Sequence, residues 1–98
     1  MHFVLSYDVI DNTAKEKIEK LISDTLNPYK YVKRLSSFYI VRIQEEQDWH
    51  RIHDLLSTFA RTSPKSFYFV MSPIIYRGRY NGWLPADSWA AINDISDY

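Results

Sequence analysis

Apolar and polar residues alternate with two different periods along this chain, and each change of period marks a new element. Runs of β-branched, aromatic and aliphatic residues with a period of two, or with no polar break, are typical of β-strands. Four such runs are present. The strands that they predict are residues 2–7, 31–35, 38–43 and 67–71. Each run is short and bounded by polar or turn-forming residues, so each is expected to be one strand of a single sheet.

Two intervening segments carry apolar residues at spacings of three and four, which indicates one buried face of an α-helix. The first apolar stripe consists of Ile18, Leu21, Ile22 and Leu26. The second consists of Trp49, Ile52, Leu55, Leu56 and Phe59. Thr13 and Glu16 have the spacing of a capping box at the start of the first helix, and Pro28 follows its end. Asp48 is the predicted N-cap of the second helix.

The pattern in the C-terminal part of the chain predicts two further secondary-structure elements. Residues 74–76 are expected to form a short edge strand, and residues 84–95 a short helix with Pro85 near its start. Trp83 and Trp89 are too large and apolar to be left in water, so they must pack on something. Two arrangements remain open: the segment covers the sheet of its own chain, or it docks on a second chain.

The order of the main elements is strand, helix, strand, strand, helix, strand. This order predicts an α+β, ferredoxin-like βαββαβ fold, with a four-stranded antiparallel sheet, two helices on one face, and the short C-terminal strand and helix added. In that topology the first and third strands lie at the centre of the sheet. Residues 1–98 are expected to form a single domain, because 98 residues that are 46% hydrophobic suffice for one core.

Charge and cysteine content narrow the functional classes. Twelve basic and twelve acidic residues cancel, so contact with nucleic acid would require a local basic patch. Cysteine is absent, which excludes disulfides, thiolate zinc sites and cysteine nucleophiles and suits a cytoplasmic protein. No apolar run approaches the roughly 18 residues of a membrane span, so no membrane association is expected.

Three short motifs carry a resemblance to a known family. Residues 4–11, "VLSYDVID", and residues 34–41, "RLSSFYIV", resemble the Cas2-like group of small ferredoxin-like proteins. Residues 82–93, "GWLPADSWAAIN", look like the end of the short Cas2-like proteins of the SinR family. The resemblance implies a homodimer in which the Asp that ends the first strand, one from each subunit, binds a divalent metal for cleavage of RNA or DNA.

Residue by residue, Asp8 matches that catalytic and metal-binding acid, and Ser37 matches the serine of the third strand. Residues 13–15 stand where the family has a basic pair, and Leu35 stands where it has a Gln. Mg²⁺ is the expected metal, because it prefers carboxylate oxygens and retained water. The simpler alternative is that Asp8 only ends a strand beside the N-terminus of a helix, where a negative charge is favourable.

Basic residues near tyrosines provide the candidate nucleic-acid contacts, since Lys and Arg bind phosphates and aromatic rings stack on bases. These candidates are Lys33, Arg34, Arg77 and Arg79. The alternative is that the tyrosines cover a dimer interface, where Tyr and Arg are enriched. His50 and His53 share a helix face, but no third metal ligand accompanies them, and they are expected to be surface or half-buried residues without a metal.

Two functions remain open at this point. One is a metal-dependent endonuclease or nucleic-acid-binding protein that uses Asp8. The other is a non-catalytic assembly or regulatory module, linked to a toxin–antitoxin or defence system, whose dimer surface is its function.

Overall fold

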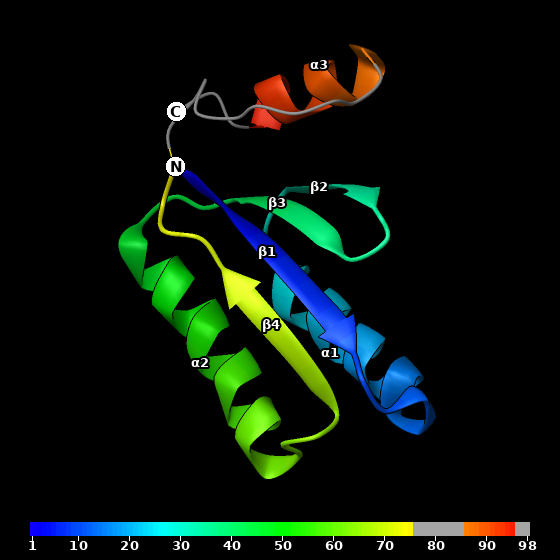
Figure 1. The fold of residues 1–98 in the computed structure, drawn as a ribbon. Coiled ribbons are helices and arrows are strands. Elements are labelled where there is room, and N and C mark those ends of the chain that lie inside the picture. Colours follow the sequence, from blue (N-terminus) through cyan, green and yellow to red (C-terminus); the bar gives the residue numbers. More distant parts are fainter. Residues whose placement is uncertain (76–85, 96–98) are drawn as a thin grey trace.

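The computed structural model describes residues 1–75 and 86–95, which form an α+β structure around a four-stranded antiparallel sheet (Figure 1). This architecture is compatible with a ferredoxin-like fold. The strands are β1 (His2–Val9), β2 (Tyr31–Leu35), β3 (Phe38–Arg42) and β4 (Phe67–Met71). The helices are η1 (Asn12–Ala14, a 3₁₀ turn), α1 (Lys15–Leu26), α2 (Glu46–Thr62) and α3 (Ala86–Ile95). All four predicted strands and both predicted amphipathic helices are therefore confirmed.

The strands lie in the order β2-β3-β1-β4, and every neighbouring pair is antiparallel. The first and third strands are central, as predicted. β1 pairs with β3 on one side, where Leu5 lies opposite Tyr39, and with β4 on the other, where Leu5 lies opposite Met71. The two pairings overlap at Leu5 and Ser6, so among these strands the start of β1 is paired with β3 alone and its end, which includes Asp8, with β4 alone.

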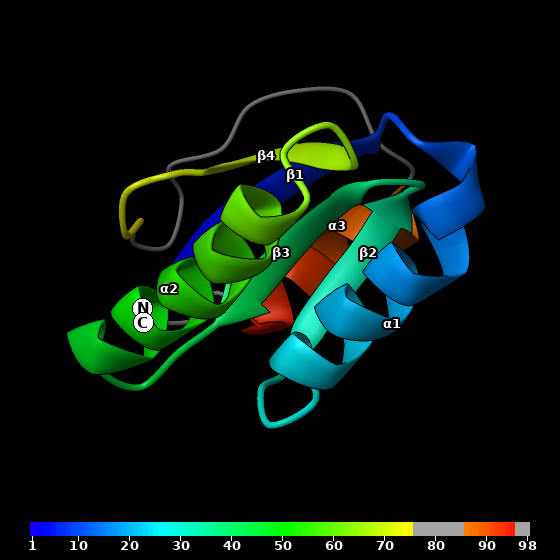
Figure 2. The ribbon, with the colours of Figure 1, turned by 90° about the horizontal axis from the view of Figure 1, so that it is seen from below.

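One face of the sheet is covered by α1 and α2, which lie side by side in front of the strands in Figure 2. The main core of the molecule lies in this layer, and its most buried members come from all three elements: Phe3 and Leu5 of β1, Ile22 of α1, and Ile52 of α2 are fully buried. Each such side chain contributes about 1.5–3 kcal/mol to folding by leaving water. The two predicted apolar stripes thus account for the helix-covered face.

The opposite face is covered in part by α3, which lies behind the sheet in Figure 2. Ile92 and Ile95 of α3 pack with Ile40 of β3, and Val32 of β2 lies against this small cluster. Of the two arrangements left open by the sequence, the described part of the C-terminal segment therefore covers the sheet of its own chain. Trp83 lies outside the described residues, as does the side chain of Trp89.

The two helix starts differ from the prediction. The Asp11 carboxylate accepts hydrogen bonds from the backbone N–H (3.0 Å) and the hydroxyl (2.6 Å) of Thr13, so Asp11 caps the 3₁₀ turn. The capping box predicted for Thr13 is wrong, because the N-cap of α1 is Ala14 and Thr13 lies one residue before it, in the 3₁₀ turn. Asp48 lies inside α2, and its carboxylate accepts from the backbone N–H groups of Gln44 and Glu45. The N-cap of α2 is Glu45.

The predicted edge strand at residues 74–76 reduces, within the described residues, to one isolated bridge between Ile75 and His2. Ser72 ends the regular pairing of β4, since its hydroxyl accepts a hydrogen bond from the Val4 N–H at 2.8 Å. Pro73 follows and has no N–H to donate. The chain therefore leaves the sheet edge at this point and returns to it for one residue.

Candidate functional site

Asp8 lies near the end of β1 and points away from α1 and α2. Its neighbour Tyr7 is buried in the helix-covered core, and successive strand residues point to opposite faces. The Asp8 side chain is exposed, and none of the residues that the structure describes makes a hydrogen bond or ion pair with it. The sequence predicted Asp8 at the end of a central strand, and the structure has it on β1, with its side chain facing solvent.

The surface around Asp8 is formed by two neighbouring strands. Tyr68 of β4 lies directly opposite Asp8, and Val70 lies opposite Ser6. Tyr68 is 60% exposed and Val70 is 70% exposed, the largest exposures among the big apolar side chains that the structure describes. We call these four residues the β1–β4 surface. Side chains in such cross-strand pairs lie about 4.5–5.5 Å apart at their Cβ atoms, so Tyr68 is an immediate neighbour of Asp8.

The sequence analysis did not identify Tyr68 as an exposed neighbour of Asp8. In the run at residues 67–71, Phe67 and Phe69 alternate with Tyr68 and Val70. Phe67 and Phe69 face the helices, and Tyr68 and Val70 therefore face the other side. That alternation separates the two faces of β4, but because both faces are apolar the sequence does not tell which one is exposed.

The acids near Asp8 do not gather into a metal-binding cluster. Among the described residues, no group of three or more His, Asp or Glu side chains is placed to hold a metal ion. Asp11 is the nearest acid in sequence, but its carboxylate is engaged by Thr13, and these hydrogen bonds lower its pKa. Among the described residues of one chain, Asp8 is thus the one free carboxylate at this position. A metal held by two carboxylates would need the second from another chain.

Lys33 lies on the opposite side of the sheet from Asp8. Its ammonium group sits 5.2 Å from the centre of the Tyr39 ring, a cation–π contact on the helix-covered face. Tyr39 in turn stacks on Tyr7 at 6.1 Å, and burial together with Tyr39 raises the pKa of Tyr7 to about 12. The structure therefore does not bring Lys33 and Asp8 into one site.

The other predicted basic residues are only partly described. Arg34 lies in β2, where the pairing with β3 is irregular between Lys33 and Leu35, and its side chain is not described. Arg77 and Arg79 lie outside the described residues. For these three residues, the nucleic-acid contact stays a prediction.

Two other basic residues lie together at the far end of the sheet. Lys30 and Arg42 both line two neighbouring hollows, of about 470 and 460 Å³, at the end of the sheet away from Asp8. Acidic residues also line them, Asp48 in the first and Asp94 in the second. The charge of these hollows is mixed, so they do not form a purely cationic path for a phosphate backbone.

The histidines of α2 serve as packing partners of an indole. His53 stacks parallel to Trp49 with ring centres 5.2 Å apart, and His50 meets the same ring edge-on at 5.1 Å. His53 also approaches Asp54 (3.3 Å) and Ser57 (3.4 Å). His53 and Ser57 are half-buried and Asp54 is exposed, and none of the three lines a hollow formed by the described residues, so the contact is one of packing.

Comparison of the chain with protein families, with curated proteins and with solved structures finds no match in any of the three. Among the described residues, no helix is long and apolar enough to cross a membrane.

Proposed function

We propose that this chain is a Cas2-like, nucleic-acid-associated protein of the cytoplasm with a ferredoxin-like βαββαβ fold. The order of the strands along the chain and across the sheet supports this fold, as do the two helices that share one face. The three motifs that resemble Cas2-like and SinR-family proteins support the family.

The proposed activity is metal-dependent endonuclease cleavage of RNA or DNA by a homodimer. The observation that carries it is the exposed Asp8 carboxylate, which no described residue engages and which lies on central strand β1 where that strand pairs with β4. Mg²⁺ usually takes one or two protein carboxylates and keeps several waters. Asp8 from each of two chains would hold it, and the metal would supply charge stabilisation at the scissile phosphate and a more acidic bound water.

The proposed phosphate contacts divide between the two sides of the sheet. Lys33 belongs to the helix-covered side, so it would hold a part of the nucleic acid remote from Asp8. Arg34, Arg77 and Arg79 are the remaining candidates for contacts near the scissile phosphate. Such contacts are electrostatic and weaken as the salt concentration rises.

The test is cleavage of labelled single- and double-stranded RNA and DNA by wild-type protein and by Asp8→Asn, with Mg²⁺ or with EDTA. We expect Mg²⁺-dependent cleavage that falls by about tenfold to a hundredfold or more in the variant, because a metal ligand is lost. Asp54→Asn is the matched control, since Asp54 is an exposed acid on α2. Cleavage that survives in Asp8→Asn, or an inactive wild-type protein, would reject the nuclease.

A second function, a non-catalytic assembly or regulatory module of a toxin–antitoxin or defence system, is favoured by a different observation. Tyr68 and Val70 expose an aromatic and an aliphatic side chain beside Asp8. Adjacent exposed apolar residues on a sheet are typical of a protein contact surface. A dimer in sedimentation experiments that Val70→Lys dissociates, together with an absence of cleavage, would establish this function in place of the nuclease.

A further inference from the structure

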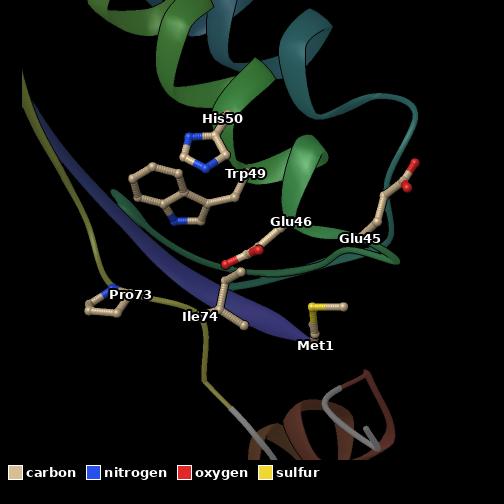
Figure 3. Close-up of a pocket in the computed structure, with 7 residues that line it drawn as sticks. All are labelled: Met1, Glu45, Glu46, Trp49, His50, Pro73 and Ile74. Atoms are coloured by element: carbon tan, nitrogen blue, oxygen red, sulfur yellow. The ribbon is translucent and has the colours of Figure 1, made fainter.

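A hollow of about 640 Å³ lies where the first turn of α2 faces the segment that follows β4 (Figure 3). The apolar part of its wall consists of Met1, Trp49, Pro73 and Ile74, and the polar part of Glu45, Glu46 and His50. The volume is in the range of small-molecule sites, roughly 300–1,000 Å³. The hollow lies at the start of β1, about 20 Å along the strand from Asp8, so it is separate from the candidate site described above.

The indole in this wall is held in place before any ligand arrives. Its Nε1–H donates a hydrogen bond to the Ser72 carbonyl oxygen at 2.9 Å. One ring face is stacked on His53, almost parallel at 6°. Ser72 is itself fixed to β1, because its N–H donates to the Val4 carbonyl oxygen at 2.8 Å. A ligand therefore meets a formed wall and loses little free energy to ordering it.

The side chains that line the hollow present negative charge. Glu46 is exposed, and Figure 3 shows its carboxylate extending from α2 towards Ile74, while Glu45 extends to the other side. No described residue forms a hydrogen bond or ion pair with the Glu46 carboxylate, and no Lys or Arg is among the described lining residues. The Met1 amino group carries the opposite charge, but burial, and then Arg42, lower its pKa.

The start of a helix ordinarily attracts anions, because its backbone N–H groups are unpaired. At α2 one of these N–H groups, that of the N-cap residue Glu45, is bound by a side chain of the helix itself. The Asp48 carboxylate accepts from the N–H groups of Gln44 and Glu45, at 3.2 and 3.3 Å. Of the two carboxylates that line the hollow, Glu46 is the one that extends towards its apolar wall (Figure 3).

We propose that this hollow binds a small organic cation: a protonated amine whose apolar body lies against Trp49 and Ile74 and whose ammonium group pairs with Glu46. The apolar wall favours the body of such a ligand, and charge complementarity favours the ammonium group over a neutral or acidic end. The proposal is independent of the nuclease and assembly functions, since none of its residues belongs to the β1–β4 surface.

The experiment is a titration of the full chain with 2-phenylethylammonium, followed by NMR. The reporter is the indole N–H signal of Trp49, which Trp49→Phe identifies among the three tryptophans of the chain. We expect a saturable shift with a dissociation constant of the order of millimolar, which is typical of a ligand with one exposed ion pair and one small apolar group. The isosteric probes are 2-phenylethanol, which is neutral, and phenylacetate, which is an anion.

Glu46→Gln keeps the shape of the side chain and removes the negative charge of Glu46, while that of Glu45 stays. We expect it to weaken binding of the amine by about fivefold and to leave binding of the alcohol unchanged. The matched control is Glu16→Gln, because Glu16 is also an exposed acid in the first turn of a helix; it should change binding by less than about twofold.

Three results would overturn the proposal: no saturable shift, equal affinity for the amine and the alcohol, or equal effects of Glu46→Gln and Glu16→Gln. A lysine-containing peptide that binds where the free amine does not would also overturn it, because the site would then recognise a partner protein.

Discussion

The two faces of the sheet are built from the same strands but are covered to different extents. On the face of α1 and α2, one cluster of buried residues joins both helices to β1, β3 and β4. On the other face, α3 covers the part formed by β2 and β3, and the β1–β4 surface stays exposed. In β1 this difference appears as strict alternation: Leu5 and Tyr7 are buried, and Ser6 and Asp8 are exposed.

The comparison shows how one strand can stabilise the fold and still present a functional group. The residues of β1 that face the helices are apolar, and their burial supplies the stability of the sheet. The residues of β1 on the β1–β4 surface contribute little to stability by burial. Asp8 can therefore be charged there without a desolvation penalty. Covered and exposed faces should therefore respond differently to the same kind of substitution.

The largest effect is expected from truncation of a buried side chain on the helix-covered face. Ile22 of α1 is fully buried in the main cluster, and Ile22→Ala should lower the free energy of unfolding by about 2–5 kcal/mol. Ile92→Ala makes the same change in the small cluster under α3, where we expect a smaller loss because, among the described residues, this cluster is smaller than the main one. Urea unfolding followed by circular dichroism measures both.

Hydrogen exchange sharpens this contrast. Ile92→Ala should increase exchange in α3 while the amides of β1 and β3 stay protected, because the main core is intact. Equal losses of stability in the two variants would show that both faces belong to one cooperative core, and the comparison would then be wrong.

An intermediate effect is expected from His2, a fully buried residue at the start of β1. Burial lowers its pKa from the ordinary 6.5 to about 4, with the nearby chain amino group adding to the shift. Between these values the unfolded chain binds a proton that the folded chain does not. Protonation therefore favours unfolding, and stability is lost as the pH falls from about 6.5 towards 4.

The measurement is the free energy of unfolding at pH 7 and pH 4.5 for wild-type protein and His2→Asn. The wild-type protein should lose about 1–2 kcal/mol more than the variant over this interval. His50→Asn is the control, since His50 is exposed, and it should keep the wild-type slope. A wild-type slope in His2→Asn would mean that His2 does not contribute to the pH dependence.

The smallest effect is expected on the β1–β4 surface. Val70→Thr should change the free energy of unfolding by less than about 0.5 kcal/mol, because Val70 is 70% exposed. The same substitution at Val41, which is fully buried on the helix-covered face, should cost about 1–3 kcal/mol, because a hydroxyl is then buried. Thermal unfolding of both variants tests this. A cost above about 1 kcal/mol for Val70→Thr would mean that Val70 is covered in solution.

The elements of this fold were predictable because each has a clear period. The apolar stripe of α1 and the alternation in β2 and β3 depend only on residues near each other in sequence. The helix starts were less predictable, because adjacent polar residues compete for the same amides. Thr13 and Asp11 are both good caps, and the structure shows that the Asp11 carboxylate binds the Thr13 hydroxyl itself.

The candidate site was predictable only in part. The position of Asp8 follows from β1 alone, whereas its pairing with Tyr68 depends on the register between two strands far apart in sequence. The separation of Lys33 from Asp8 has the same origin. Charged residues that a sequence suggests for one site can lie on opposite faces of a sheet. The face of each residue follows from the alternation along its strand and from the pairing of that strand with its neighbours.

The central position of β1 also has a consequence for the order of folding. β1 is made first, but its partners on β3 lie about 30 to 40 residues later, and those on β4 about 60 residues later. During synthesis the β2–β3 hairpin can close by itself, since its contacts are local. β1 has both neighbours only once β4 has left the ribosome, so until then the strand that carries Asp8 has an open edge that chaperones can bind.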